Sequence, residues 1–383
     1  DLVETMTPTE AQCDNRQFGE VSSTLGGLDH ASAAVVGYSK YLGLARAEVA
    51  YIGGLDGQLH AIYLRGSQTG FTAPAPGTEL WAFVPKGQLP RLATNNARVD
   101  MSPIVSDVFV DYDDTNADGV LSASERSTGK YRWRTLLVSG SGRLGGELFA
   151  LDVTDPMKPI VLWDVVANSD KTDSTLAAEN TTPRWRENWK DGGANPPPLY
   201  SDLTQPTKFT GPYNYSDLGD TLAVNLVPVR RGNRPSYQVV LATNGAKSGA
   251  QQMQVFAIDA GTGKKIWQWE RPYGEDTSNS VPGGTSTLDV DGDGSIDRVY
   301  AGDMEGRIWE LSAYTGINLN YFGKDSTAVS YPLFSTEDTL HPVSTVPAIM
   351  RLPDPFQKDS MFAKMGVGSK AANKLALVFG TAG

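Results

Sequence analysis

The feature that most constrains the fold is a repeated unit of strand, glycine-containing turn and strand. Residues 50–62 (AYIGGLDGQLHAI) and residues 299–311 (VYAGDMEGRIWEL) are close copies of this unit, each with alternating apolar residues in its second arm. Looser copies occupy residues 135–152 and 239–259, and a further copy begins at residues 375–380. Alternation around a glycine turn is typical of antiparallel hairpins. We therefore expect an all-β chain.

The spacing of these hairpins favours a β-propeller. They recur at intervals of roughly 60 to 100 residues, longer than the 40 to 50 of compact propeller blades, so we expect long insertions between strands. The looser copies are followed by tryptophan-containing strands at residues 159–163 and 265–269, and the run GTGKKIW at residues 261–267 resembles quinoprotein-type blades. The prediction is a modified, quinoprotein-like β-propeller, with a β-sandwich as the alternative. Six tryptophans are expected in its core: Trp81, Trp133, Trp163, Trp267, Trp269 and Trp309.

The repeats also divide the chain. Residues 1–47 are interpreted as an N-terminal lead-in, partly helical because residues 30–37 can form a short helix after an Asp29 cap. Residues 48–383 are assigned to the propeller, with a polar insertion at residues 167–220. The sequence begins without a recognisable start and ends after a predicted strand that has no partner following it, so we expect a fragment of a longer protein.

Composition narrows the classes of partner. The net charge of -11 disfavours binding to nucleic acid or to anionic lipid, because phosphate groups need a basic face, and it favours divalent cations. The sequence contains no run of 18 apolar residues, so we expect no transmembrane segment in this chain. Cys13, the single cysteine, allows no intrachain disulfide.

Residues 114–125 (DTNADGVLSASE) match a calcium-binding loop at every position. Such loops supply oxygen ligands from positions 1, 3, 5, 7, 9 and 12 and carry glycine at position 6. Glycine stands at position 6 here, as Gly119. The predicted ligands are Asp114, Asn116, Asp118, Val120 through its carbonyl, Ser122 and Glu125. Because the flanking residues 104–110 and 131–136 are typical of strands, we expect a calcium loop inserted between two strands. The alternative is an acidic solvated turn.

Residues 289–297 (DVDGDGSID) predict a second site. The ligands expected there are Asp289, Asp291, Asp293, Ser295 through its carbonyl and Asp297. Position 12 is Tyr300 in place of glutamate. Four carboxylates within nine residues repel one another without a cation, so metal binding is favoured over an empty turn. Calcium fits better than magnesium, which prefers a strict octahedron with retained water, and zinc would favour His or Cys.

Catalytic patterns are weak in this sequence. A nucleophile elbow requires Gly-x-Ser-x-Gly between a strand and a helix, whereas residues 139–142 read SGSG and are followed by no predicted helix. Residues 142–146 (GRLGG) are glycine-rich but precede neither a helix nor a lysine that would bind phosphate. We predict that the chain is not an enzyme.

Four stretches together resemble the PilC/PilY family of type IV pilus tip proteins. They are residues 79–92 (ELWAFVPKGQLPRL), 133–156 with FALDVTDP at its end, 295–303 (SIDRVYAGD) and the closing FGT at residues 379–381. The segment before residue 26, the insertion at residues 167–220, and Ala382 in place of glycine depart from the family pattern.

This resemblance implies a modified propeller at the pilus tip on the cell surface, in the outer membrane or periplasm during assembly. It implies roles in pilus biogenesis, retraction, twitching motility and adhesion, with minor and major pilins and a host or abiotic surface as partners. In that family a calcium loop governs retraction, and the matching positions are those of residues 289–297. Two rivals remain: a quinoprotein-type dehydrogenase, which commonly has adjacent cysteines whereas Cys13 stands alone, and a non-catalytic envelope assembly scaffold.

Overall fold

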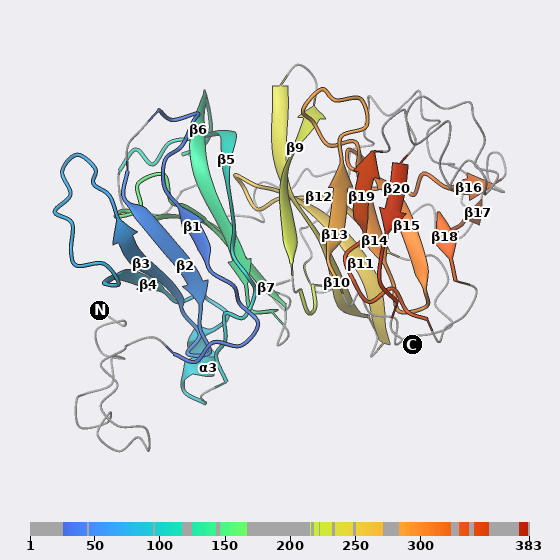
Figure 1. Cartoon of the computed structure of the whole chain (residues 1–383), viewed down its shortest axis with the longest axis horizontal. Coiled ribbons are helices and arrows are strands. Elements are labelled where there is room, and N and C mark those ends of the chain that lie inside the picture. Colours follow the sequence, from blue (N-terminus) through green and yellow to red (C-terminus); the bar gives the residue numbers. More distant parts are fainter. Residues whose placement is uncertain are drawn as a thin grey trace, which may run out of the picture.

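The structure is a computed structural model of the whole chain, and it consists largely of strands (Figure 1). It describes residues 26–43, 46–94, 96–116, 125–142, 146–166, 215, 218–221, 223–231, 234–247, 250–270, 283–322, 329–336, 341–351 and 375–381.

Four antiparallel sheets of four strands follow one another along the described chain; the first three are meanders, and in the fourth β18 lies beside β15. The first contains β1 (Ala34–Val36), β2 (Glu48–Gly53), β3 (Leu59–Arg65) and β4 (Glu79–Phe83). The second contains β5 (Ile104–Tyr112), β6 (Arg126–Gly140), β7 (Glu147–Asp152) and β8 (Ile160–Val166). The third contains β9 (Val224–Arg231), β10 (Arg234–Lys247), β11 (Ala250–Asp259) and β12 (Lys265–Glu270). The fourth contains β13 (Thr285–Leu288), β14 (Arg298–Gly302), β15 (Arg307–Ser312) and β18 (Phe334–Ser335).

Smaller elements complete the described chain. Strands β16 (Tyr321–Phe322) and β17 (Val329–Ser330) pair with each other, as do β19 (Ala348–Arg351) and β20 (Leu375–Val378). A short helix, α3 (Leu89–Leu92), lies between the first and second sheets in the sequence. Among the described residues, no helix has the length and apolar character needed to cross a membrane.

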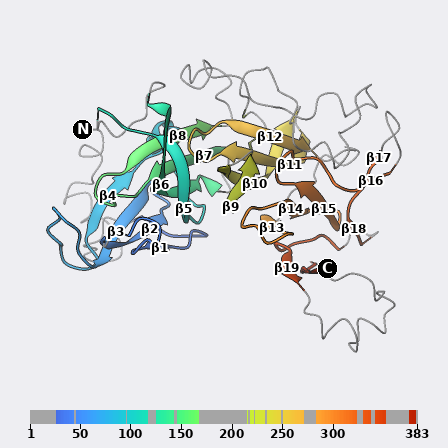
Figure 2. The ribbon, with the colours of Figure 1, turned by 90° about the horizontal axis from the view of Figure 1, so that it is seen from above.

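The sheets are arranged as the blades of a propeller. The first strand of each sheet contacts the first strand of the next, in the order β1, β5, β9, β13 and β19. These first strands follow the inner side of the arc in Figure 2, and β4, β8 and β12 follow its outer side. The expected all-β, modified propeller is therefore confirmed, and we call the four sheets blades one to four. The four predicted hairpins, and the fifth that begins at residue 375, all coincide with observed strands.

Packing of both faces of a blade distinguishes this arrangement from a β-sandwich. In blade two, Leu136 and Leu148 pack towards blade three, whereas their neighbours Leu137 and Phe149 pack towards blade one. All four side chains are fully buried. Successive residues of a strand point to opposite faces, so a blade buried on both faces needs consecutive apolar residues. The core is thus a series of layers between blades.

Tryptophans join consecutive blades through hydrogen bonds. The indole Nε1 of Trp81 donates to the carbonyl of Pro156, that of Trp163 to Ala260 and that of Trp267 to Ala313, at 2.7, 2.8 and 2.9 Å. Each acceptor follows the third strand of the next blade. Trp163, Trp267, Trp269 and Trp309 are buried as expected, whereas Trp81 and Trp133 are only partly buried.

The helix predicted after Asp29 is wrong for the described residues. Residues Ala34–Val36 instead form β1, in which Val35 pairs with Ala50 and Val36 with Val49. Pairing with a neighbouring strand outweighs the helix start signal, because β-branched residues suit a pleated sheet. The segment assigned to the lead-in thus contributes a strand to blade one. Residues 1–25, including Cys13, lie outside the described residues, as does most of the insertion at residues 167–220.

Candidate metal sites

Both predicted calcium loops occupy the same position within a blade. Residues 113–125 connect β5 to β6 in blade two, and residues 289–297 connect β13 to β14 in blade four. Each therefore joins the first strand of its blade to the second. Because strands alternate in direction along a meander, such loops open at the same end of a propeller. The expectation that the first loop lies between strands is confirmed.

Backbone amides fold the second loop around Asp289. Its Oδ1 accepts from the N–H of Gly292 at 2.6 Å, and its Oδ2 accepts from the N–H of Gly294 at 2.8 Å. These glycines have φ values of +82° and +87°, a region that residues with a Cβ rarely adopt. The alternating Asp-Gly sequence therefore permits the turn and supplies its hydrogen-bond acceptors together.

The last residue of the second loop holds its two ends together. The N–H of Val290 donates to Asp297 Oδ2 at 2.7 Å, and the N–H of Asp297 donates to the carbonyl of Leu288 at 2.9 Å. The neighbouring N–H of Ile296 donates to the carbonyl of Pro228 in β9 at 2.8 Å. The loop is thus closed on itself and attached to blade three.

Three of the predicted ligands converge. One carboxylate oxygen each from Asp289, Asp291 and Asp297 lie within 4.8 Å of one another, an arrangement that could hold a metal ion. The carboxylate of Asp293 lies instead near Arg230 of β9, with Oδ2 3.2 Å from the guanidinium Nη1. Ser295, predicted to ligate through its carbonyl, is buried at the end of the loop.

The electrostatics of this loop differ between its first and last carboxylates. Burial would raise the pKa of Asp289, but the amides of Gly294 and Gly292 outweigh it and hold that pKa below its usual value. The pKa of Asp297 is raised, by burial and by repulsion from Asp291 and Asp289, although the Val290 amide lowers it. Mutual repulsion of this kind is what a bound cation would relieve.

The first loop is described at its start and end. Asp114, Asn116 and Glu125 fall within the described residues, whereas Asp118, Val120 and Ser122 lie outside them. The buried Glu125 accepts through Oε1 from the N–H and Oγ1 of Thr115, each at 2.8 Å, and from the N–H of Asn116 at 3.2 Å. The predicted twelfth ligand therefore closes the loop onto its first residues.

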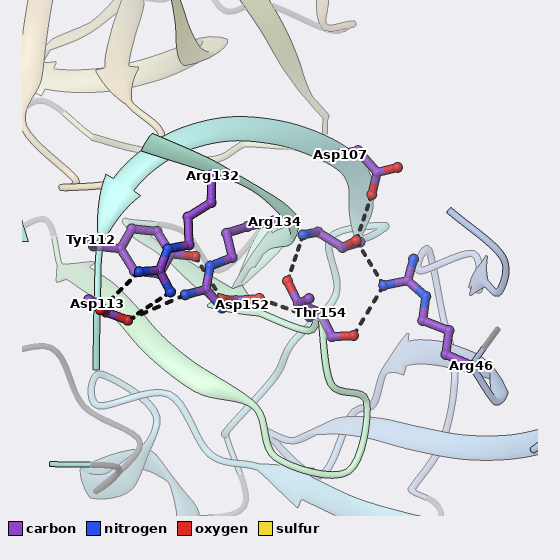
Figure 3. Close-up of polar contacts among 9 residues, drawn as sticks. Arg46, Asp107, Tyr112, Asp113, Arg132, Arg134, Asp152 and Thr154 are labelled. Carbon is purple, nitrogen blue, oxygen red and sulfur yellow. Dashed lines mark hydrogen bonds and ion pairs between the residues drawn. The ribbon is translucent and has the colours of Figure 1, made fainter. Parts of the chain in front are cut away.

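A network of ionic and hydrogen-bonding groups backs the first loop (Figure 3). Asp113 accepts from Arg132 at 3.1 and 3.2 Å and lies 3.8 Å from Arg134. Arg134 lies 3.6 Å from the buried Asp152, which also accepts from the hydroxyl of Tyr112 at 2.8 Å. This network positions the strand ends that carry the loop.

Sequence reasoning missed this network and the role of Arg230. The alternation of Arg132 and Arg134 along a strand was one available signal, and the basic run at residues 230–234 (RRGNR) in an acidic chain was another. Neither signal indicates which carboxylate is the partner, since Asp293 and Arg230 lie 63 residues apart.

Comparison with known proteins points to one family. A "Type IV pilus biogenesis factor PilY1 homolog" of Xylella fastidiosa is 29% identical over 294 residues, which cover 74% of this chain and 18% of that protein. The "Type IV pilus biogenesis factor PilY1" of Pseudomonas aeruginosa is 24% identical over 388 residues, covering 88% of this chain and 26% of that protein. The chain therefore spans about a fifth to a quarter of the length of these curated relatives.

Among solved structures, the C-terminal domain of Pseudomonas aeruginosa PilY1 is similar, with a TM-score of 0.49 and 20% sequence identity. The match covers 88% of this chain and 53% of that domain. A scan against protein-family models finds no match.

Proposed function

We propose, from the premise that this chain belongs to the PilC/PilY family of type IV pilus biogenesis factors, that it is a calcium-binding propeller which acts in pilus biogenesis. The observation that carries the proposal is the convergence of Asp289, Asp291 and Asp297 within 4.8 Å, in a loop closed by its own backbone amides. Carboxylate oxygens in a flexible loop are the ligands that calcium prefers.

The proposed ligand set has two parts. Asp289, Asp291 and Asp297 would bind first, because their oxygens already converge. Asp293 would complete the set by turning away from Arg230, and Ser295 would add its carbonyl oxygen. In blade two, Glu125 would play the corresponding closing role, together with Asp114, Asn116, Asp118, Val120 and Ser122.

The proposed effect of the ion is to clamp two blades. The second loop is hydrogen bonded to β9 through Ile296 and Pro228 at 2.8 Å, so its conformation is linked to the edge of blade three. Loss of the ion would leave the carboxylates to repel one another and would loosen this contact. Such a loop can act as a two-state element whose populations calcium shifts.

The biological role extends this proposal to the whole protein. Relatives described as type IV pilus biogenesis factors support a role in pilus assembly. We propose that the domain lies at the pilus tip on the cell surface, reached through the periplasm and outer membrane, and that it contacts minor and major pilins. Control of retraction, twitching motility and adhesion to a host or abiotic surface are the proposed outcomes, and catalysis is not part of the proposal.

Calorimetric titration tests the metal sites. Calcium should bind the chelator-stripped protein in two events, of which Asp291→Asn removes one and Glu125→Gln the other. Glu48→Gln, which removes a carboxylate paired with the exposed Arg65 in blade one, should retain both events. Absence of saturable binding in the unmodified chain would refute the proposal, and so would two events that persist in Asp291→Asn.

A cellular assay tests the role in the pilus. A strain that lacks the full-length protein should regain surface pili and twitching when it expresses the unmodified gene or the Glu48→Gln variant. The Asp291→Asn variant should give altered piliation or motility at equal protein level. Equal piliation and motility for all three would separate calcium binding from pilus function.

A further inference from the structure

Five aromatic side chains from three blades form a connected set, which we call the aromatic surface: Tyr41, Phe109, Tyr131, Trp133 and Tyr237. Tyr41 stacks on Trp133 with ring centroids 4.1 Å apart and planes within 14°. Phe109 contacts Trp133 at 5.4 Å and Tyr131 at 5.7 Å, and Tyr237 meets Trp133 edge-on at 6.2 Å. Tyr41 and Tyr131 remain 57% and 41% exposed, so the set has rings open to solvent.

Strand register builds the centre of this surface. In the β5–β6 hairpin, Phe109 lies opposite Trp133 and Asp111 lies opposite Tyr131. Because side chains alternate along a strand, these residues share one face of the hairpin. The other face carries Val108, Val110 and Tyr112, which are buried in the layer between blades two and three.

Hydrogen bonds hold the segment around Tyr41 against this hairpin. Ser39 Oγ donates to Asp107 Oδ2 at 2.6 Å, and Arg46 Nη1 donates to Thr135 Oγ1 at 2.8 Å. Thr135 Oγ1 in turn donates to Asp107 Oδ1 at 2.6 Å. Figure 3 shows Arg46 and Asp107 at the two ends of this series of hydrogen bonds. The segment is therefore anchored on both sides of Tyr41. Rings held in place in this way lose little conformational entropy when a ligand binds.

Two carboxylates, those of Asp107 and Asp111, lie on the face of the hairpin that carries the rings. Asp107 accepts from Ser39 and Thr135, whereas Arg132 lies opposite Val110 on the other face, where it pairs with Asp113. Asp111 accepts from the backbone N–H of Lys130 at 2.9 Å. Carboxylates beside the rings repel the negative charge of a phosphate or sulfate group and can accept hydrogen bonds from hydroxyl groups. A neutral ligand that carries hydroxyl groups therefore suits this face better than an anionic one.

We propose that the aromatic surface binds a neutral carbohydrate. A sugar ring has faces of C–H groups and a rim of hydroxyl groups. The faces would stack on the exposed rings of Tyr41 and Tyr131, as other apolar groups do on aromatic rings. The rim hydroxyls would hydrogen bond to the tyrosine hydroxyls and to Asp111, whose carboxylate oxygens accept more than one hydrogen bond each. This inference rests on the proposed role in surface attachment and names the chemistry of the attached surface.

Binding to a defined set of sugars tests the inference. Cellotriose, maltotriose and chitotriose are titrated into the whole chain, with a sialylated and a sulfated trisaccharide for comparison, and calorimetry measures the binding. At least one neutral sugar should bind saturably. Tyr41→Ala and Tyr131→Ala should each weaken that binding by roughly three- to tenfold, the range expected for loss of one stacked ring. Tyr331→Ala, which removes a tyrosine of similar exposure outside this surface, should bind normally.

Several outcomes overturn the inference. They are no saturable binding to any neutral sugar, binding to the charged sugars alone, and equal weakening by Tyr331→Ala. Repeating the titration with calcium and with chelator separates this test from that of the metal sites. A chain that binds calcium but no sugar contradicts the carbohydrate surface alone. A chain that binds sugar but no calcium contradicts the metal sites alone.

Discussion

The guanidinium of Arg230 in blade three lies 3.2 Å from the carboxylate of Asp293 in blade four. Asp293 is a predicted calcium ligand, and one of its carboxylate oxygens is paired with this arginine from the neighbouring blade. The arginine side chain is 67% exposed, and ion pairs of this kind contribute little to stability. Its effect should therefore appear mainly in metal affinity.

Replacing Arg230 should strengthen calcium binding. Arg230→Gln removes a positive charge beside the second loop and releases Asp293, so we expect affinity there to rise by about two- to fivefold at low salt. Calorimetry measures the change, and Arg65→Gln, an exposed arginine in blade one paired with Glu48, is the matched control. Unchanged or weaker binding in Arg230→Gln would show that Asp293 takes no part.

The contact between Gly316 and Trp267 should be intolerant of a methyl group. Gly316 has a φ of +73°, and a Cβ there would lie 2.5 Å from the Trp267 ring. Gly316→Ala should lower the free energy of unfolding by about 3 kcal/mol, from steric overlap and positive φ together. Gly77 also has a positive φ, but nothing lies within 4 Å of its Cβ position, so Gly77→Ala should cost about 1 kcal/mol. Urea unfolding compares them, and equal losses would mean that the blade contact is not tight.

Two carboxyl groups should make the domain less stable as pH rises from 5 to 8. Burial and repulsion from Glu147 raise the pKa of Asp164 to about 7, and burial raises the pKa of Glu147. A carboxyl group whose pKa is higher in the folded than in the unfolded state stabilises the folded state. This contribution is complete below the unfolded pKa, near 4, and is lost as the pH rises through 7. We expect a loss of about 3 kcal/mol, reduced in Asp164→Asn. The free energy of unfolding is measured at each pH for both proteins, and the same dependence on pH in both would contradict this prediction.

His60 should stabilise the first blade most at low pH. Its ring lies between Glu79 at 2.8 Å and Asp56 at 3.0 Å. Burial alone would lower the pKa of His60, but hydrogen bonds to Asp56 and Glu79 outweigh it and raise that pKa. The stabilisation is present below the unfolded pKa, about 6.5, and is lost as pH rises through the raised value. His60→Gln should therefore cost more stability at pH 6 than at pH 9, as measured by thermal unfolding, and an equal cost would indicate a neutral imidazole.

The hairpins could be predicted because their signals are local. Alternating apolar residues around Gly306 specify β14, β15 and the turn between them, whatever the rest of the chain does. The helix prediction after Asp29 failed because β1 depends on a partner, β2, whose pairing no local pattern records. Short apolar segments are ambiguous in this way, since tertiary pairing decides their conformation.

The candidate metal site also has one part that the sequence predicts and another that it does not. The spacing of Asp289, Asp291 and Asp297 determines which oxygens can converge, because a nine-residue loop closes on itself. The spacing does not predict that Asp293 turns to Arg230, which depends on how blade three packs against blade four. The aromatic surface is a stronger case, because its rings come from three blades.

The sequence by itself therefore determined the elements whose partners are neighbours along the chain: the hairpins, their glycine turns and the spacing of the carboxylates in each acidic loop. Only the tertiary structure decided which blades meet, which arginine reaches Asp293 and which rings stack on Trp133. The physical reason is that strand alternation and turn chemistry act over a few residues, whereas packing between blades depends on the shapes of surfaces formed by distant segments.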